Sequence, residues 1–314
     1  MLNRRHIRIK VMQTLYAFNG TESDDLKKDE KFLLHSLDSM YDLYLIILSL
    51  LVEVQKKAEE RLSISQKKFL ATFEEKNPNY KFVNNTILTL IKEDLALKNE
   101  IENRKLDCWY LDFEYIDILL KAILESSIYK DYMKTKTSNF IEDKNFLIDI
   151  FSEIIAPNEK LYDYFEDKKL TWIDDLPIVN TSILKLLKKV RPNVPANFFT
   201  PGLYKDLEDR EFAIDLFKKT VLNRSKFSEE IAKKTTNWDS DRIANLDAVL
   251  LQMALCEFQK FPSIPFKVTI NEYLEIAKEY STPKSSIFIN GILDKMIKEY
   301  SDEGKHSKTG RGLL

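Results

Sequence analysis

The most informative stretch of the sequence is LDAVLLQMALCEF, residues 246–258. Apolar residues occupy nearly every position, which predicts a helix that is apolar on most of its faces. Such a helix must be covered on every side by the rest of the chain. It should end before Pro262 and Pro265, because proline lacks a backbone donor and clashes with the preceding turn. The stretch therefore predicts a core helix around which other helices pack.

Two further helices are expected after it. Thr269 and Glu272 have the spacing of a capping box, which predicts that a helix opens near Thr269. Thr282 followed by Pro283 predicts the N-cap and first position of the last helix. Gly291 falls inside that last helix, where a close contact between two helices is the expected reason for a glycine.

The N-terminal half predicts two more helices. Residues 1–18 form an amphipathic pattern whose apolar stripe is Ile7, Val11, Leu15 and Phe18. Residues 30–62 predict a long helix with a broad apolar face. Strand signals are nearly absent, so the predicted fold class is all-α.

The sequence also contains a duplication. The segment EDKNFLIDIF (142–151) parallels EDREFAIDLF (208–217), displaced by 66 positions, and the same displacement carries Trp172 onto Trp238. One ungapped displacement over this length predicts an internal repeat. A fainter third copy would include Trp109. At each repeat, the tryptophan is expected to fill a joint between helices.

Composition limits the functional classes. With 314 residues, 31% charged and 44% hydrophobic, and a net charge of -2, the chain has an ordinary soluble composition. Cys108 and Cys256 lie in apolar surroundings and are expected to be free thiols. There is no secretory signal, and the most apolar run is about half the roughly 20 residues that span a bilayer. We expect a cytoplasmic protein with no membrane contact.

Catalytic signals are scarce. The three histidines have no neighbour at metal-ligand spacing, and the sequence has no phosphate-binding glycine loop, nucleophile elbow or dinucleotide fingerprint. We therefore expect no enzyme activity, no metal and no cofactor.

The N-terminal helix is the best functional candidate. Arg4 and Arg8 lie one turn apart, Arg5 and Lys10 widen the same polar surface, and Tyr16 could stack on a base. Guanidinium groups beside an aromatic ring suit single-stranded RNA. Because three or four phosphate contacts give modest, salt-sensitive affinity, a partner protein is expected to contribute.

At this point the sequence resembles a known family. RRHIR (4–8) and QTLY (13–16) look like the Arg-rich N-terminal motif of the NusB transcription antitermination factors. Residues 246–258 resemble the family's apolar helix ending in Ala-Leu-x-Glu-Leu. IPFKVTINE (264–272) resembles its Val-Pro-x-Lys-Val-x-Ile-Asn-Glu, and FINGILD (288–294) resembles its Phe-Val-Asn-Gly-Val-Leu-Asp.

The resemblance covers residues 1–20 and 205–300, which implies an N-terminal basic helix and a C-terminal helical bundle of a NusB-like fold. Residues 21–204 would be a helical insertion with internal repeats, similar to long homologues of the Bacteroidetes type. Residues 301–314 are expected to form a disordered tail.

The resemblance also implies partners. Family members bind the boxA element of RNA together with NusE, a ribosomal protein of the small subunit, and join the RNA polymerase antitermination complex, chiefly on ribosomal RNA transcripts. By position, Arg4, Arg5 and Arg8 match the family's RNA-contacting arginines. Lys284 lies where the RNA surface continues, and Asp247 matches an acidic position that faces the partner.

Two departures from the family pattern remove positive charge. Gln252 replaces an arginine of the apolar helix, and His6 stands where another arginine is common. An alternative is therefore a non-catalytic helical scaffold that binds proteins and has lost RNA binding. A helical accessory domain of an RNA methyltransferase is a third reading, although the sequence has no strand–glycine–helix unit for a nucleotide.

Overall fold

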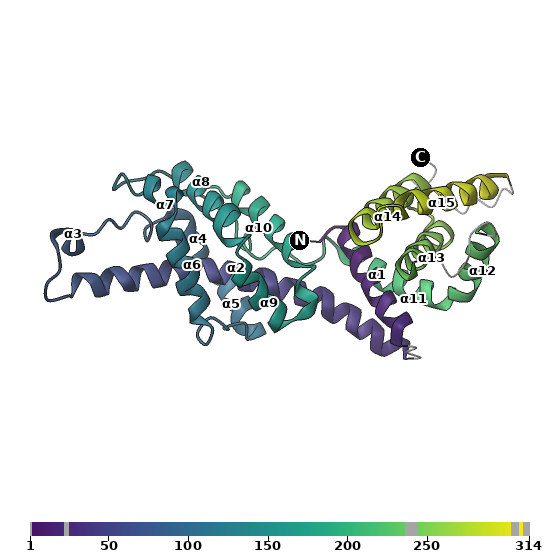
Figure 1. Cartoon of the computed structure of the whole chain (residues 1–314), viewed down its shortest axis with the longest axis horizontal. Coiled ribbons are helices and arrows are strands. Elements are labelled where there is room, and N and C mark those ends of the chain that lie inside the picture. The colour runs from purple at the N-terminus through teal and green to yellow at the C-terminus, as the bar shows by residue number, and fades with distance from the viewer. Residues whose placement is uncertain (1, 22–24, 236–243, 303–307, 310–314) are drawn as a thin grey trace. The chain divides into compact units, whose positions relative to one another are not determined.

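The structure, a computed structural model, describes residues 2–21, 25–235, 244–302 and 308–309 (Figure 1). These residues form fifteen α-helices and no strand, so the all-α prediction is confirmed. They divide into two compact units: unit 1 comprises residues 38–203, and unit 2 comprises residues 2–37 together with 204–314. None of the described helices is both long and apolar enough to cross a membrane.

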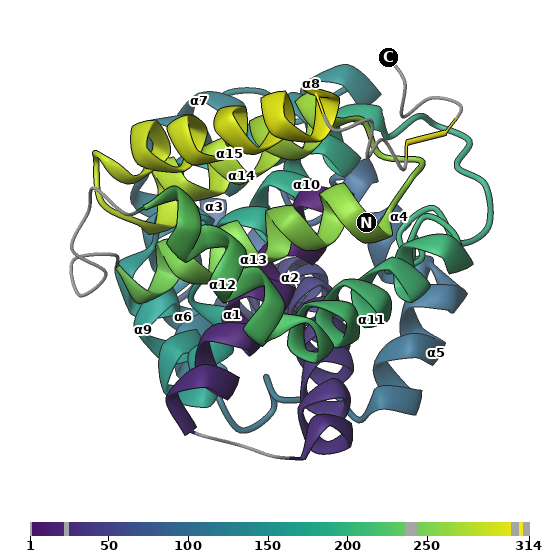
Figure 2. The same cartoon turned by 90° about the vertical axis from the view of Figure 1, so that its right-hand side faces the viewer.

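Unit 2 is built around the predicted core helix. Its helices are α1 (Arg4–Thr21), α11 (Leu207–Leu222), α12 (Arg224–Lys234), α13 (Asn245–Lys260), α14 (Phe266–Tyr280) and α15 (Ser285–Asp302). Helix α13 contacts all five others (Figure 2). Every residue from Val249 to Phe258 is buried. The predicted requirement for cover on every side is therefore confirmed.

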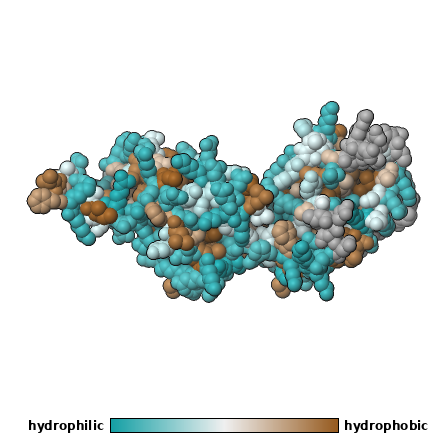
Figure 3. Space-filling view, turned by 60° about the horizontal axis from the view of Figure 1, so that its bottom comes forward, coloured by the Kyte–Doolittle hydropathy of each residue, from teal (hydrophilic) through white to brown (hydrophobic). Residues whose placement is uncertain are grey.

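Unit 1 is arranged along the long helix α2 (Leu26–Gln66), whose residues from Asp38 onward belong to it. Its other helices are α3 (Phe73–Lys76), α4 (Thr86–Glu93), α5 (Leu95–Arg104), α6 (Phe113–Glu125), α7 (Ser127–Tyr132), α8 (Phe140–Ile150), α9 (Glu159–Lys168) and α10 (Leu176–Lys189). On the face shown in Figure 3, apolar residues form small separate patches on a mostly hydrophilic surface.

The repeated tryptophans fasten the connectors between helices to α2. The indole N–H of Trp109 donates to the carbonyl of Ile46 at 3.1 Å, and that of Trp172 donates to the carbonyl of Ser39 at 2.9 Å. These two acceptors are seven residues apart, which is about two helical turns. The segments that carry Trp109 and Trp172 thus bind α2 at two points about two turns apart. Trp238 lies outside the described residues.

The order of helices also repeats. Helices α11, α12 and α13 begin within three residues of the positions expected when α8, α9 and α10 are displaced by 66. A buried carboxylate recurs in the first turn, as Asp143 in α8 and Asp209 in α11. Asp143 accepts hydrogen bonds from Thr86 and Tyr132, whereas Asp209 accepts one from Arg4. The two segments therefore share an order of helices and differ in the side chains that the buried carboxylate binds.

Three local predictions need correction. Helix α14 begins at Phe266 rather than near Thr269, because the carbonyl of Pro265 already accepts from the amide of Thr269, and the capping box does not form. Helix α15 begins at Ser285, two residues after the predicted proline. Gly291 is exposed, and an added Cβ would meet nothing within 4 Å, so the predicted close helix–helix contact is wrong.

Candidate functional site

Two arginines of α1 lie half-exposed and are held by carboxylates of neighbouring helices. Arg4 donates through Nε to Asp209 at 3.0 Å. Arg5 binds Glu272 through both Nε and Nη2, each at 2.9 Å. The hydrogen bond with Glu272 raises the pKa of Arg5, and the same bond lowers the pKa of Glu272. Both arginine side chains are 39% exposed, so each presents part of its surface to solvent.

A third arginine is buried. Arg8 binds Glu257 of α13 with Nε at 2.6 Å and Nη2 at 2.8 Å, and the side chains are 3% and 0% exposed. Glu257 also accepts hydrogen bonds from Thr269 and Tyr273. Burial acts to lower the pKa of Arg8, but the charge and hydrogen bonds of Glu257 outweigh it, so the pKa is raised. This network ties α1 and α14 to the core helix.

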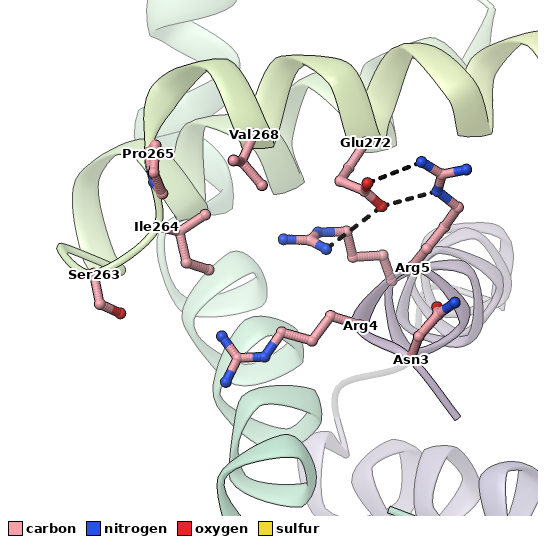
Figure 4. Close-up of a pocket in the computed structure, with 9 residues that line it drawn as sticks. Asn3, Arg4, Arg5, Ser263, Ile264, Pro265, Val268 and Glu272 are labelled. Carbon is pink, nitrogen blue, oxygen red and sulfur yellow. Dashed lines mark hydrogen bonds and ion pairs between the residues drawn. The ribbon is translucent and has the colours of Figure 1, made fainter. Parts of the chain in front are cut away.

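The exposed arginines line a cavity of about 530 Å³ (Figure 4). Its walls are formed by the start of α1, the turn before α14 and the first turns of α14, with the lining residues Asn3, Arg4, Arg5, Arg8, Ser263, Ile264, Pro265, Val268 and Glu272. The apolar side is made by Ile264, Pro265 and Val268. A ligand there would meet oriented guanidinium groups on one side and a small apolar surface on the other.

The prediction of one continuous exposed cationic surface is wrong for two residues. Arg8 and Lys10 are each only 2% exposed. The reason is that α1 is covered by α11, α13 and α14, so its polar side faces other helices as well as solvent. Tyr16 is 50% exposed and remains available for stacking. An RNA contact by Arg8 or Lys10 stays a prediction, and both side chains are buried in this fold.

Lys284 is exposed in the turn before α15, as predicted. This turn is fixed by Asp247, which is 5% exposed. One oxygen of Asp247 accepts from Ser281 at 2.6 Å and the other from Ser285 at 2.7 Å. A partner contact by Asp247 stays a prediction. Its contacts within unit 2 position the turn that carries Lys284.

Sequence reasoning missed the three carboxylates that hold the arginines, Asp209, Glu257 and Glu272. Glu257 is the single acid in the buried stretch of α13 from Val249 to Phe258, and a buried charge requires a partner. That signal pointed to a cation elsewhere in the chain without saying which one. Glu272 was assigned to a helix cap, whereas it binds Arg5. Gln252, at the position of the family's arginine, is 8% exposed and donates to Ser228.

One residue of the predicted tail is folded against α13. The ammonium of Lys308 donates to the carbonyls of Glu257 at 2.9 Å and Phe261 at 3.0 Å. Burial lowers its pKa to about 8. A cation near a helix C-terminus is also favoured by the helix dipole. The expectation of a wholly solvated tail is therefore wrong at Lys308, while residues 303–307 and 310–314 lie outside the described residues.

Comparison with known proteins agrees with the resemblance. The NusB family profile matches residues 203–298, which nearly coincide with the C-terminal part of unit 2. The transcription antitermination protein NusB of Salinibacter ruber is 44% identical over 112 residues, 36% of this chain and 70% of that protein. The chain belongs to the NusB family. The prediction of an antitermination-factor family is confirmed.

Two other NusB relatives match at similar levels. The Chloroherpeton thalassium protein is 39% identical over 109 residues, 35% of this chain and 52% of that protein. The Koribacter versatilis protein is 43% identical over 103 residues, 32% of this chain and 70% of that protein. Their names describe antitermination proteins rather than enzymes, which agrees with the prediction that this chain is not an enzyme. No solved structure gives a significant match.

The family profile does not reach the N-terminal motif, since its match begins at residue 203. Helix α1 nevertheless packs on α11, α13 and α14 within the same unit. The arginines of α1 therefore lie outside the segment that the family profile matches, and they pack against helices of that segment.

Proposed function

We propose that this protein is an antitermination factor that binds boxA-type single-stranded RNA together with NusE, in the cytoplasm, and supports transcription of ribosomal RNA within the RNA polymerase antitermination complex. The observation that carries the proposal is the pair of half-exposed arginines, Arg4 and Arg5, beside a cavity in the unit that matches the family. Lys284 and Tyr16 add an exposed cation and an exposed ring.

The ion pairs of Arg4 and Arg5 affect both the order and the net charge of this surface. Asp209 and Glu272 orient the guanidinium groups, so less side-chain freedom is lost when they bind a phosphate. The same carboxylates offset the positive charge. We therefore expect weak binding of RNA by the protein alone and a shallow dependence on salt. NusE would supply the remaining contacts.

We also propose that residues 21–204 are a helical insertion that arose in part by copying the family's own helices. The shared helix order of α8–α10 and α11–α13, and the carboxylate common to Asp143 and Asp209, support this origin.

A gel shift with boxA RNA, with and without NusE, tests the function. The double variant Arg4→Gln/Arg5→Gln should weaken binding in the presence of NusE by about tenfold or more, because each charged hydrogen bond contributes about 1.5–3 kcal/mol. The matched control is Arg224→Gln/Lys233→Gln on α12, which removes the same charge from exposed positions of unit 2.

Circular dichroism must first show that both variants keep the helicity of the parent protein. Equal binding by both variants and the parent would contradict the role of α1. If the parent protein with NusE gives no shift at physiological salt, the result would favour the alternative, a protein-binding scaffold that has lost RNA binding. The pairing of Arg4 and Arg5 with carboxylates supports this alternative.

A further inference from the structure

A basic cavity lies in unit 1, where α10 ends. Its volume is about 730 Å³, and its lining residues are Lys144, Lys188, Lys189, Val190, Arg191, Asn193, Val194, Pro195 and Phe198. Four of these nine residues are cations, and none of the described lining residues is acidic. Lys185 lies one turn before Lys188 and Lys189 and adds to the same basic region.

Most of these cations are not neutralised. Lys188, Lys189 and Arg191 are exposed, and none of them forms an ion pair with a carboxylate among the residues that the structure describes. Cations in the last turn of a helix often serve its C-terminal carbonyls. Here that role belongs to Lys144 of α8, whose ammonium donates to the carbonyls of Lys188 at 2.8 Å and Val190 at 3.3 Å. The other three charges are left available to a ligand.

The cavity also contains an aromatic ring and polar donors. Phe198 is half-buried and packs edge-on against the buried Phe199, with ring centroids 5.1 Å apart. In the described structure, the amides of Asn193 and Val194 donate to no protein acceptor. Cations and amides bind phosphate oxygens, and a ring beside them stacks on a base. A small inorganic anion would leave the ring unused, whereas a nucleotide has a phosphate for the cations and a base for the ring.

We propose that this cavity is a second RNA-binding site, which holds the phosphates of single-stranded RNA with Lys188, Lys189 and Arg191 and stacks one base on Phe198. The site lies wholly in unit 1, in the part of the chain outside the family match. It deepens the proposed function and rests on it for the identity of the ligand, RNA.

Fluorescence anisotropy with the full chain, without NusE, and a labelled 20-nucleotide oligouridylate that lacks boxA tests the site. The variant Lys188→Glu/Lys189→Glu/Arg191→Glu should lose about tenfold or more in affinity, and the slope of log affinity against log salt should fall by about 2, since each contact to a single strand contributes about 0.7. Phe198→Leu should lose about fivefold with the slope unchanged, because stacking is not ionic.

The control is Lys121→Glu/Lys130→Glu/Lys134→Glu, which changes charge equally at exposed positions of unit 1. Its affinity should stay within about twofold of the parent for the same salt range. An equal loss in the control, an unchanged affinity in the cavity variant, or displacement of the RNA by polyglutamate at the same charge concentration would overturn the proposal. The last outcome would indicate a site for acidic peptides.

Failure of this proposal can be told apart from failure of the proposed function, because the two use different variants and RNAs. If the cavity variant loses oligouridylate binding while Arg4→Gln/Arg5→Gln leaves boxA binding unchanged, the function assigned to α1 would be contradicted and this site would be supported. The opposite pattern would remove this site alone.

Discussion

The cations at the two candidate sites differ in how they are paired. In unit 2, Arg4, Arg5 and Arg8 of α1 each bind a carboxylate of another helix. In unit 1, the exposed cations at the end of α10 have no such partner among the described carboxylates. A basic run in a sequence therefore does not reveal how much charge is available to RNA. The arginines of α1 stabilise the fold through their ion pairs in addition to any role in ligand binding. The exposed cations at the end of α10 can be replaced without the loss of an ion pair.

The largest expected effect comes from the buried ion pair of unit 2, Arg8 with Glu257. Arg8→Ala should destabilise unit 2 by about 3–5 kcal/mol, because it leaves Glu257 charged, buried and without its cation. Native-state hydrogen exchange of the α13 amides measures this loss within unit 2. Arg4→Ala should cost less than Arg8→Ala, because Arg4 is 39% exposed whereas Arg8 is buried together with its partner, although the partner of Arg4, Asp209, is itself buried.

Replacing both members, Arg8→Met with Glu257→Met, should recover part of the loss, since an apolar pair of similar volume avoids the buried charge. The recovery should be incomplete, because the buried hydroxyls of Thr269 and Tyr273 lose their acceptor. If Arg8→Ala instead costs no more than Arg4→Ala, then the ion pair is not structural and the contrast between the two regions fails.

A smaller effect is expected at Arg5, and it depends on pH. The hydrogen bond from Arg5 lowers the pKa of Glu272 below its ordinary value of 4.5. The folded state therefore binds fewer protons than the unfolded state near this pH. The pair stabilises the protein above about pH 4.5, and this contribution is lost as the pH falls through the folded pKa.

Arg5→Gln should make the thermal midpoint less sensitive to pH between about 3 and 6, by an amount worth less than about 1 kcal/mol, because the pair is partly exposed. Circular dichroism melts across this range measure the difference. Identical pH profiles for parent and variant would show that the pKa of Glu272 does not depend on Arg5.

The smallest effect is expected in unit 1. The neutral variant Lys188→Gln/Lys189→Gln/Arg191→Gln should change stability by no more than about 0.5 kcal/mol, because exposed substitutions away from specific contacts have small effects. Thermal melts of parent and variant compare the two. A loss above about 1 kcal/mol would reveal a structural role for these cations and weaken the case for a ligand site.

Local pattern predicted the parts of the fold that depend on neighbouring residues. The apolar run of α13 predicted a surrounded helix, and the 66-residue displacement predicted helices at corresponding positions. The capping box failed because Thr269 faces Glu257, a residue of another helix. The prediction of a close helix–helix contact at Gly291 failed for a related reason. The presence of a glycine does not by itself show whether another helix packs against it.

By itself the sequence determined the all-α class, the positions of the long helices and the family, since helical periodicity and motif spacing are local properties of the chain. Only the tertiary structure decided which charges are satisfied. Arg8 and Glu257 are 249 positions apart, and their meeting depends on how α1 packs on α13. Periodicity assigns a residue to a face of its helix. The neighbour that covers that face sets whether the charge there holds the fold together or remains free to bind.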